Sequence, residues 1–157
     1  MAAEFVEGKL TSNKPPIERV AIIDNDKTMG LFYGIGYSKN GIYNSPLPKK
    51  ERYLNPMIAL LILLTDHPTN QPLIIIMPSL YAYNVVTRYL KVWKEHNWLQ
   101  SNGTLVPHGE DVMDPLYQNL KLHSKWVFRY FPSYTHPQIV KDGIKYVNTM
   151  KKYLETS

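Results

Sequence analysis

Two acidic residues separated by a single position, Asp24 and Asp26, directly follow an apolar run in the stretch "RVAIIDND". Carboxylates at the end of a buried strand can hold metal ions or act as acids and bases. If the strand stays regular, the two side chains share a face and Asp26 could assist Asp24. If the strand ends first, Asp26 and Lys27 lie in a solvated turn. We favour the turn, which leaves Asp24 as the candidate for chemistry.

A basic and aromatic stretch between residues 88 and 98 is a candidate for binding rather than catalysis. Its basic residues recur at every third position, so on a helix they would form one stripe beside two tryptophans. Basic side chains neutralise phosphates, and exposed aromatic rings stack on bases. An open alternative is that the tryptophans pack one helix against another and leave the lysines as a solvated edge. The predicted nucleic-acid-binding residues are Arg88, Lys91, Trp93, Lys94, His96 and Trp98.

Composition limits the remaining chemistry. The chain has 157 residues, enough for one domain with a substantial core, and carries a net charge of +5 with a pI near 9.3. A basic excess suits a polyanionic partner, although soluble basic domains share it. The absence of cysteine excludes a disulfide framework and is typical of an intracellular protein, nuclear or cytoplasmic. No close metal-ligand spacing occurs among His67, His108, His123 and His136.

Neither a membrane span nor a secretion signal is expected. The longest apolar run, residues 57–64, is too short to cross a bilayer. The N-terminus lacks the basic region and apolar core of a signal peptide. We therefore expect no membrane partner, an N-terminal tail or lead-in over residues 1–17, and a single domain over residues 18–157.

The elements that would position these residues follow from periodicity and turn signals. Short strands are predicted over residues 19–26, 30–37 and 40–45, with Asn40-Gly41 as a hairpin signal. A helix should begin at Asn55, with that residue as its N-cap and Pro56 next. Residues 71–78 read as a buried strand, and Ser79 can cap a following helix that breaks near Arg88. A helix over 110–123, a strand over 124–132 and a terminal helix over 136–155 complete the chain.

This order, βββ-α-β-α-α-β-α, resembles the type 1 ribonuclease H domain, whose fold is shared with retroviral ribonuclease H and integrases. The segments "VAIIDND", "GLFYGIGY" and "NPMIALLILL" are similar to the first two strands and the first helix of that family. The segments "LIIIMPSLYAYNVV", "WKEHNW" and "KDGIKYVN" are similar to its central strand, its basic handle and its last helix. The resemblance implies an α/β, RNase H-like fold with a mixed five-stranded sheet and helices on both faces.

The resemblance also implies a catalytic centre that is only partly present. Enzymes of the family hold two divalent cations with four acids, and the matching positions give Asp24 as the first acid and Asp142 as the fourth. No carboxylate stands at residues 56–58, where the second is expected, and Pro78 occupies the third position. His136 lies in the loop that normally offers a histidine to help the product leave. The resemblance thus implies a pseudoenzyme without a cofactor, in which Asp24 and Asp142 are vestigial. Weak Mg²⁺ binding to this pair is allowed, because Mg²⁺ often uses one or two carboxylates plus substrate phosphates.

Three functions follow from these observations. The first is a catalytically inactive module that binds an RNA/DNA hybrid or duplex RNA, or that scaffolds a nucleic-acid-processing complex. The second is a protein–protein interaction module without nucleic-acid binding. The third is a residual Mg²⁺-dependent ribonuclease H.

Overall fold

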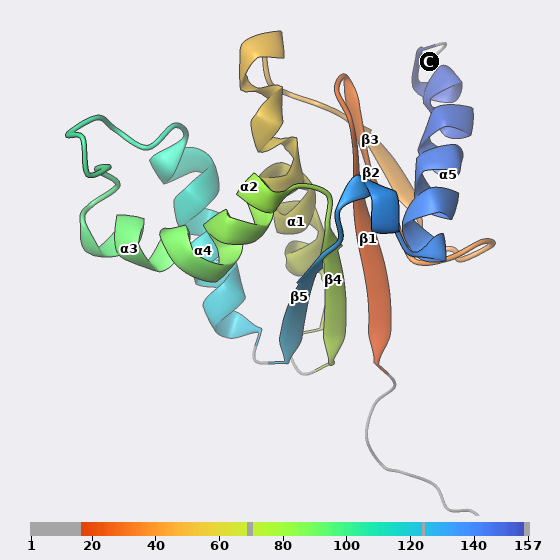
Figure 1. Cartoon of the computed structure of the whole chain (residues 1–157), viewed down its shortest axis with the longest axis horizontal. Helices are drawn as coiled ribbons and strands as arrows, with labels where there is room; N and C mark the ends of the chain where they lie inside the picture. The colour runs from red at the N-terminus through yellow and green to blue at the C-terminus, as the bar shows by residue number, and fades with distance from the viewer. Residues whose placement is uncertain (1–16, 69–70, 124, 156–157) are drawn as a thin grey trace, which may run out of the picture.

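A mixed five-stranded sheet forms the centre of the molecule in the computed structural model, which describes residues 17–68, 71–123 and 125–155 (Figure 1). The strand order is β3-β2-β1-β4-β5. The antiparallel part contains β1 (Glu18–Asn25), β2 (Thr28–Phe32) and β3 (Gly41–Asn44). The strands β4 (Leu73–Met77) and β5 (Trp126–Tyr130) are added in parallel beside β1.

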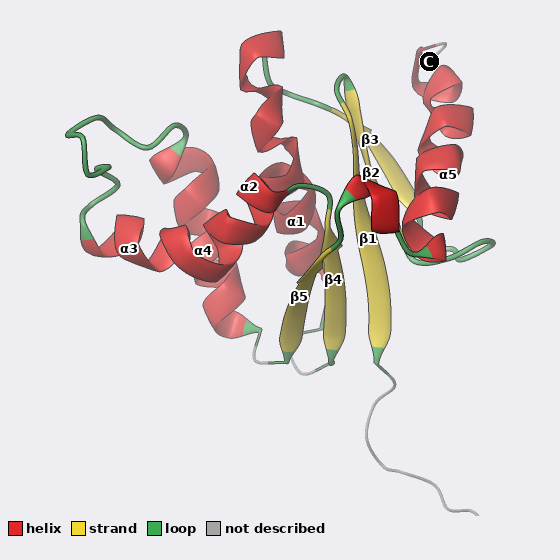
Figure 2. Ribbon diagram, viewed as in Figure 1, coloured by secondary structure: helices red, strands yellow, loops and turns green. Residues whose placement is uncertain are grey.

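Helices cover the sheet on both faces, as Figure 2 shows. On one face α1 (Asn55–Asp66) packs against β1 and β2, and α4 (Asp114–Leu122) packs against α1. On the other face α5 (Gln138–Glu155) lies against β1, β2 and β3. A 3₁₀ helix, η1 (Lys49–Leu54), leads into α1, and another, η4 (Ser133–Thr135), follows β5.

A projecting helical arm follows β4. It consists of α2 (Leu80–Asn84), the π-helical turn η2 (Val85–Tyr89) and α3 (Leu90–Glu95), which run without interruption. A loop over residues 96–108 returns the chain to a second π-helical turn, η3 (Gly109–Met113), which continues into α4. We call the segment from α2 to η3 the arm.

The strand β1 is buried on both faces because its apolar residues alternate between two clusters. Val20 and Ile22 join the larger core under α1, whereas Ala21 and Ile23 join a smaller cluster under α5. Close approach of α5 depends on glycine, since a Cβ atom at Gly143 would lie 2.8 Å from the Ile23 side chain. This packing fixes the strand that carries Asp24 near its end.

The predicted fold class and order of elements are confirmed, with local differences. The second strand ends at Phe32 rather than at residue 37, because Gly34 and Gly36 take φ angles of 149° and 80°. The Asn40 side chain stabilises this loop, accepting a bond from the Tyr33 amide and donating one to the Gly34 carbonyl. A tight hairpin was predicted there, but the side chain of Asn40 closes a longer loop instead.

The helix signals are confirmed in part. Ser79 caps α2 by accepting a bond of 3.1 Å from the Ala82 amide. Asn55 is the first residue of α1 rather than its cap, and Leu54 precedes it. The break predicted near Arg88 is the π-helical turn η2, so the arm does not divide into two separate helices there. The division into tail and domain stays a prediction, since residues 1–16 lie outside the described part. Across the described ranges, no helix is both long enough and apolar enough to cross a membrane.

Candidate functional site

Asp24 stands near the end of β1 with its carboxylate held by two hydrogen bonds. Its Oδ1 atom accepts a bond of 3.1 Å from the Asn55 side-chain amide and one of 3.2 Å from the Asp26 backbone amide. Asn55 is fully buried; its amide also donates to the Asp26 carbonyl at 2.7 Å, and its oxygen accepts a bond of 2.6 Å from the Ser45 hydroxyl. The first residue of α1 therefore orients the acid at the end of β1.

The surroundings of Asp24 change its acidity. Although the side chain reaches solvent, partial burial of the carboxyl group raises its pKa above the ordinary value of 3.8. The bonds from Asn55 and from the Asp26 amide oppose the rise, whereas the charge of Asp26 adds to it. An acid with a raised pKa beside a cavity is a functional candidate on physical grounds.

A cavity of about 250 Å³ opens where β1 and β4 end, and Asp24 lines it together with Ser79 and His136. Its walls are otherwise apolar and come from β1, β4, Phe131 and α5. The Ser79 hydroxyl is occupied as a helix cap. The cavity thus offers one carboxylate and one imidazole, a small set of polar groups in an apolar surround. His136, noted in the sequence for its loop position, belongs to the same cavity as Asp24.

Asp142 lies elsewhere. It accepts a bond of 2.9 Å from Gln138 on α5 and lines a second cavity with Ile35, Tyr37 and Lys145. The face of α5 that carries Gly143 and Val147 packs against the sheet. Asp142 lies beside that face, next to the loop after β2. The structure does not bring the two vestigial candidates into one cavity. Their joint weak binding of Mg²⁺ stays a prediction.

The two-cation arrangement of the ribonuclease H family does not fit these residues. Within the described ranges, no group of three or more His, Cys, Asp or Glu residues could hold a metal ion. The amide of Asn55 lies against Asp24, and Pro78 contributes neither a ligand nor an amide donor to the cavity wall.

Asp26 belongs to a turn, as the favoured interpretation predicted. The strand β1 ends at Asn25, and Asp26 has a left-handed φ of 56°. Its carboxylate lies 3.3 Å from the Arg52 guanidinium, on η1. Asp26 does not line the Asp24 cavity and serves instead as an anchor for η1.

The six residues predicted to bind nucleic acid divide into two groups. Arg88, Lys91 and His96 are exposed on the arm, and Trp93 is half-buried. Lys94 is half-buried as well, with its ammonium 2.7 Å from the Asp114 carboxylate and 5.9 Å from the centre of the Trp98 ring. These residues do not form one uniform exposed stripe.

Trp98 cannot play the stacking role predicted for it. Only 9% of the residue is exposed, and it packs into the larger core. Gly109 accommodates it, since a Cβ atom there would approach the Trp98 side chain to 2.9 Å. A ring that fills the space between the arm and the core is unavailable to a base, so Trp98 is a structural residue.

An exposed groove on the arm combines two predicted residues with tyrosines that the sequence did not single out. Its lining includes Tyr81, Tyr89, Trp93, His96 and Leu99, and the Tyr89 and Trp93 rings lie 5.5 Å apart. The groove continues toward η1, because the exposed rings of Tyr53 and Tyr81 meet edge to face at 5.7 Å. The only signal in the sequence was the density of tyrosine in "SLYAYNVVTRYL".

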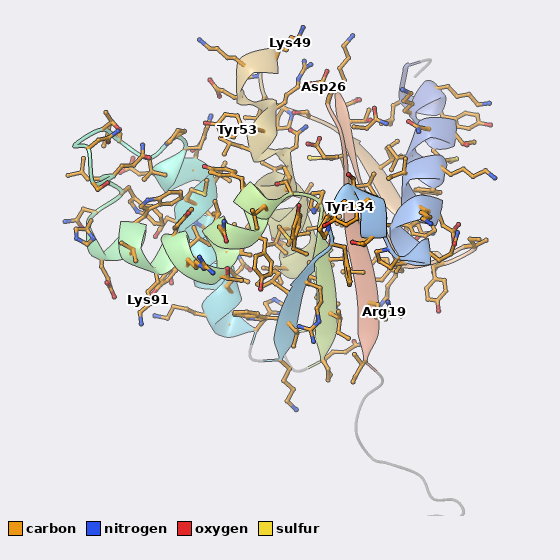
Figure 3. The ribbon with its side chains drawn as sticks, in the orientation of Figure 1. Arg19, Asp26, Lys49, Tyr53, Lys91 and Tyr134 are labelled. Atoms are coloured by element: carbon orange, nitrogen blue, oxygen red, sulfur yellow. The ribbon has the colours of Figure 1, made fainter. Side chains whose placement is uncertain are left out.

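The helix η1 adds positive charge beside this groove. Lys49 and Lys50 are exposed on it. Figure 3 shows Lys49, Tyr53 and Asp26 near the end of the molecule at which β1 finishes, with Arg19 at the opposite end and Lys91 on the arm. We give the name arm surface to a set of basic and aromatic residues of η1 and the arm, all exposed except the half-buried Trp93: Lys49, Lys50, Tyr53, Tyr81, Arg88, Tyr89, Lys91, Trp93 and His96.

Comparison with known proteins supports the fold. No family model matches the chain. Two curated proteins named Ribonuclease H, from two strains of Tropheryma whipplei, are 30% identical over 69 residues, which span 43% of this chain and 42% of theirs. The chain thus matches less than half the length of these relatives.

Solved structures match over most of the chain. The solution structure of the PFV RNase H domain has a TM-score of 0.59 at 12% identity and covers 88% of this chain and 94% of that domain. The crystal structure of LC9-RNase H1, described as a type 1 RNase H with the type 2 active-site motif, has a TM-score of 0.54 at 13% identity, covering 88% and 72%. Foamy viral protease-reverse transcriptase bound to dsDNA has a TM-score of 0.59 at 14% identity, covering 85% and 91%.

These comparisons correct one expectation. The sequence analysis predicted that the chain is not an enzyme, because two of the four expected acids are missing. That prediction is contradicted by the similar proteins, which carry the name ribonuclease H, and by the solved neighbours, which are RNase H domains. The absence of acids at two positions was insufficient ground for excluding activity. The chain has a ribonuclease H-like fold.

Proposed function

We propose that this chain binds an RNA/DNA hybrid or duplex RNA along the arm surface, with one strand of the nucleic acid passing the Asp24 cavity. The observation that carries the proposal is the continuity of that surface, in which the Tyr53–Tyr81 ring contact joins η1 to the arm. The Asp24 cavity lies beside it, because Asn55 follows η1 and bonds to Asp24. The η1 residues, the start of α2 and the candidate acid thus lie at one end of the sheet, and the arm extends from there.

The residues of this surface suit a phosphate backbone and its bases. Lys49, Lys50, Arg88 and Lys91 are exposed cations, which release counterions when they contact phosphates. Tyr81, Tyr89 and Trp93 offer rings to bases or sugars, and such stacking is tolerant of sequence. Arg52 is left out of this set because it pairs with Asp26. We expect binding that depends on charge and shape rather than on base sequence.

The expected ligand is a duplex with an RNA strand. Two fold neighbours are foamy viral protease-reverse transcriptase structures described in complex with dsDNA and with RNA/DNA hybrid. This similarity supports a duplex ligand for the present chain. The resemblance of "WKEHNW" to the basic handle of the ribonuclease H family supports the same ligand. Comparing hybrid, duplex RNA and duplex DNA of one sequence would establish the preference.

A binding titration tests this proposal. The Arg88→Ala and Lys91→Ala changes together should weaken binding to a labelled hybrid, because they remove two exposed charges from the arm surface. The Lys145→Ala and Lys152→Ala changes on α5 are the matched control, since they remove equal charge outside this surface. Absence of binding to any of the three duplexes at low salt would refute the proposal and favour the protein-partner alternative.

Cleavage of the RNA strand is the second candidate function. It is favoured by the presence of Asp24 and His136 in one cavity beside the arm surface, and by the names of the similar proteins. A divalent cation held by Asp24 and by substrate phosphates would supply charge neutralisation at the phosphate. Asp24 and His136 are the groups of this chain that could hold or move a proton there.

A cleavage assay decides this candidate. Wild-type protein is incubated with a labelled hybrid and Mg²⁺ beside Asp24→Asn and His136→Gln proteins purified in parallel. Loss of cleavage in the Asp24→Asn protein alone would assign the activity to the cavity. Equal cleavage by all three preparations would indicate a contaminating nuclease. If none cleaves, the second candidate is rejected, whereas the binding proposal is judged by its own titration.

A further inference from the structure

We propose that His108 is a positioning residue that aligns the two halves of the arm surface, so that nucleic-acid affinity depends on its protonation. The three residues involved, Glu51, His108 and Asp111, are called the His108 clamp. The inference rests on the proposed function for its effect on binding. The clamp itself can be measured without nucleic acid.

The geometry of the clamp joins distant parts of the chain. The Nε2 atom of His108 lies 2.6 Å from a Glu51 carboxylate oxygen, and these residues are 57 positions apart. The Nδ1 atom lies 2.9 Å from an Asp111 carboxylate oxygen. A charged imidazole donates through both nitrogens, whereas a neutral one donates through only one. Both contacts therefore favour the protonated ring.

The backbone directs the ring between the two acids. His108 precedes η3 and has a left-handed φ of 55°, and its carbonyl accepts bonds from the Val112 and Met113 amides at the end of that turn. The charged groups that face it are Glu51 from η1 and Asp111 from η3. The loop over residues 97–107 contains no charged residue, and the only charged residue of α1, Asp66, is at the end remote from η1. The bond to Glu51, and then the bond to Asp111, raise the pKa of His108 above 6.5.

The clamp connects the parts that carry the proposed binding residues. Glu51 lies on η1 between Lys50 and Tyr53, and His108 ends the loop that returns the chain from α3 to η3. Loss of the proton removes one of the two donated bonds, which loosens η1 relative to the arm. Lys50 and Tyr53 then lose their fixed position relative to Arg88, and affinity falls.

The direction with pH follows from the raised pKa. The charged ring stabilises the fold fully below the ordinary pKa of about 6.5, and this contribution is lost as pH rises through the folded-state pKa. Nucleic-acid binding should weaken over the same window. Because the groups are partly exposed, we expect a two- to fivefold change in affinity, about that of an exposed ion pair.

The test compares proteins with and without His108→Asn, a change that tolerates the left-handed backbone and carries no charge. Both proteins also carry His96→Gln, because His96 is a second histidine and lines the groove. Affinity for a labelled hybrid is measured from about pH 6 to about pH 8.5, spanning histidine titration. Binding by the protein that keeps His108 should fall about two- to fivefold more than binding by the His108→Asn protein. Equal pH dependence of the two proteins would overturn the positioning role.

A second measurement examines the clamp without nucleic acid. Unfolding free energies of wild type, His108→Asn, Glu51→Gln and the double variant form a cycle that isolates the pair. The proposal predicts coupling at about pH 6 that shrinks by about pH 8.5, as the raised pKa of His108 requires. Coupling that is absent, or equal at both pH values, would overturn the clamp. Absence of nucleic-acid binding at every pH would instead refute the proposed function and, with it, the alignment role.

Discussion

The side-chain amide of Asn55 donates a hydrogen bond of 3.1 Å to the carboxylate of Asp24, which ties the first residue of α1 to the end of β1. The same amide reaches the Asp26 carbonyl, and the Asn55 oxygen accepts from Ser45. One buried side chain therefore fixes the strand end, the turn after it and the connection to η1. The candidate acid is held in place before any ligand arrives.

Removing this amide should destabilise the protein. The Asn55→Ala change leaves the Asp26 carbonyl and the Ser45 hydroxyl without their buried partner, at a cost of about 2–4 kcal/mol in the free energy of unfolding. Urea denaturation measures the change. The Asn119→Ala variant is a control, because Asn119 makes a bond to Pro115 within one turn of α4 and should cost less. Equal effects of the two changes would contradict the account of Asn55.

Neutralising Asp24 should stabilise the protein at neutral pH. Because burial raises the pKa of Asp24, the folded state resists its ionisation, and stability falls as pH rises through 3.8 and the higher folded-state pKa. The Asp24→Asn change removes the free-energy cost of ionising a partly buried carboxyl group. It should therefore raise the free energy of unfolding at neutral pH and have less effect near pH 3.8. Urea denaturation at both pH values tests this, with Asp142→Asn as the matched change in the other cavity. Destabilisation by Asp24→Asn at neutral pH would be the contrary result.

Two aromatic positions should separate stability from binding. Trp98→Phe should lower stability by about 1–3 kcal/mol, because it leaves space in the core, and should not alter the affinity of the folded protein. Tyr81→Ala, at a ring 39% exposed, should weaken hybrid binding by about 1–3 kcal/mol with a smaller effect on folding. Thermal unfolding and binding titrations on both variants measure the contrast. The opposite pattern would place the binding site at Trp98.

Gly143 should resist substitution although it lies within a helix. Alanine normally favours a helix over glycine, but a Cβ atom here would lie 2.8 Å from Ile23 and 3.2 Å from Phe32. We expect Gly143→Ala to lower stability by about 1–3 kcal/mol, as overpacking does. Gly103→Ala is unsuitable as a control because of its left-handed φ of 84°, whereas Ser101→Ala tests an exposed loop site. A stabilising effect of Gly143→Ala would show that α5 can shift outward.

Local patterns predicted most of the fold. The alternation in β1, the apolar run of β4 and the Ser79 cap are signals contained in a few consecutive residues, and the topology followed from their order. The position of Asp142 could not be obtained in this way, because it depends on which side of α5 packs against the sheet. The glycine at 143 determines that side, through contacts with strands more than a hundred residues earlier.

The candidate site was predicted less completely than the fold. Asp24 was identified from its place after an apolar strand, but its partner Asn55 was taken for a helix cap. The Tyr53–Tyr81 contact joins residues 28 positions apart on different elements, so no spacing rule reveals it. Trp98 illustrates the converse limit, since basic neighbours indicated an exposed ring and the fold of the loop after α3 buries it.

The salt dependence of hybrid binding tests the central claim most directly. Wild-type affinity should fall linearly on a logarithmic scale as salt rises, and the slope should diminish by about 0.9 for each phosphate contact removed. We predict a shallower slope for Lys49→Ala with Lys50→Ala and for Arg88→Ala with Lys91→Ala, and an unchanged slope for the Lys145 and Lys152 control. Equal slopes for all four proteins, or no binding at low salt, would contradict nucleic-acid recognition by the arm surface.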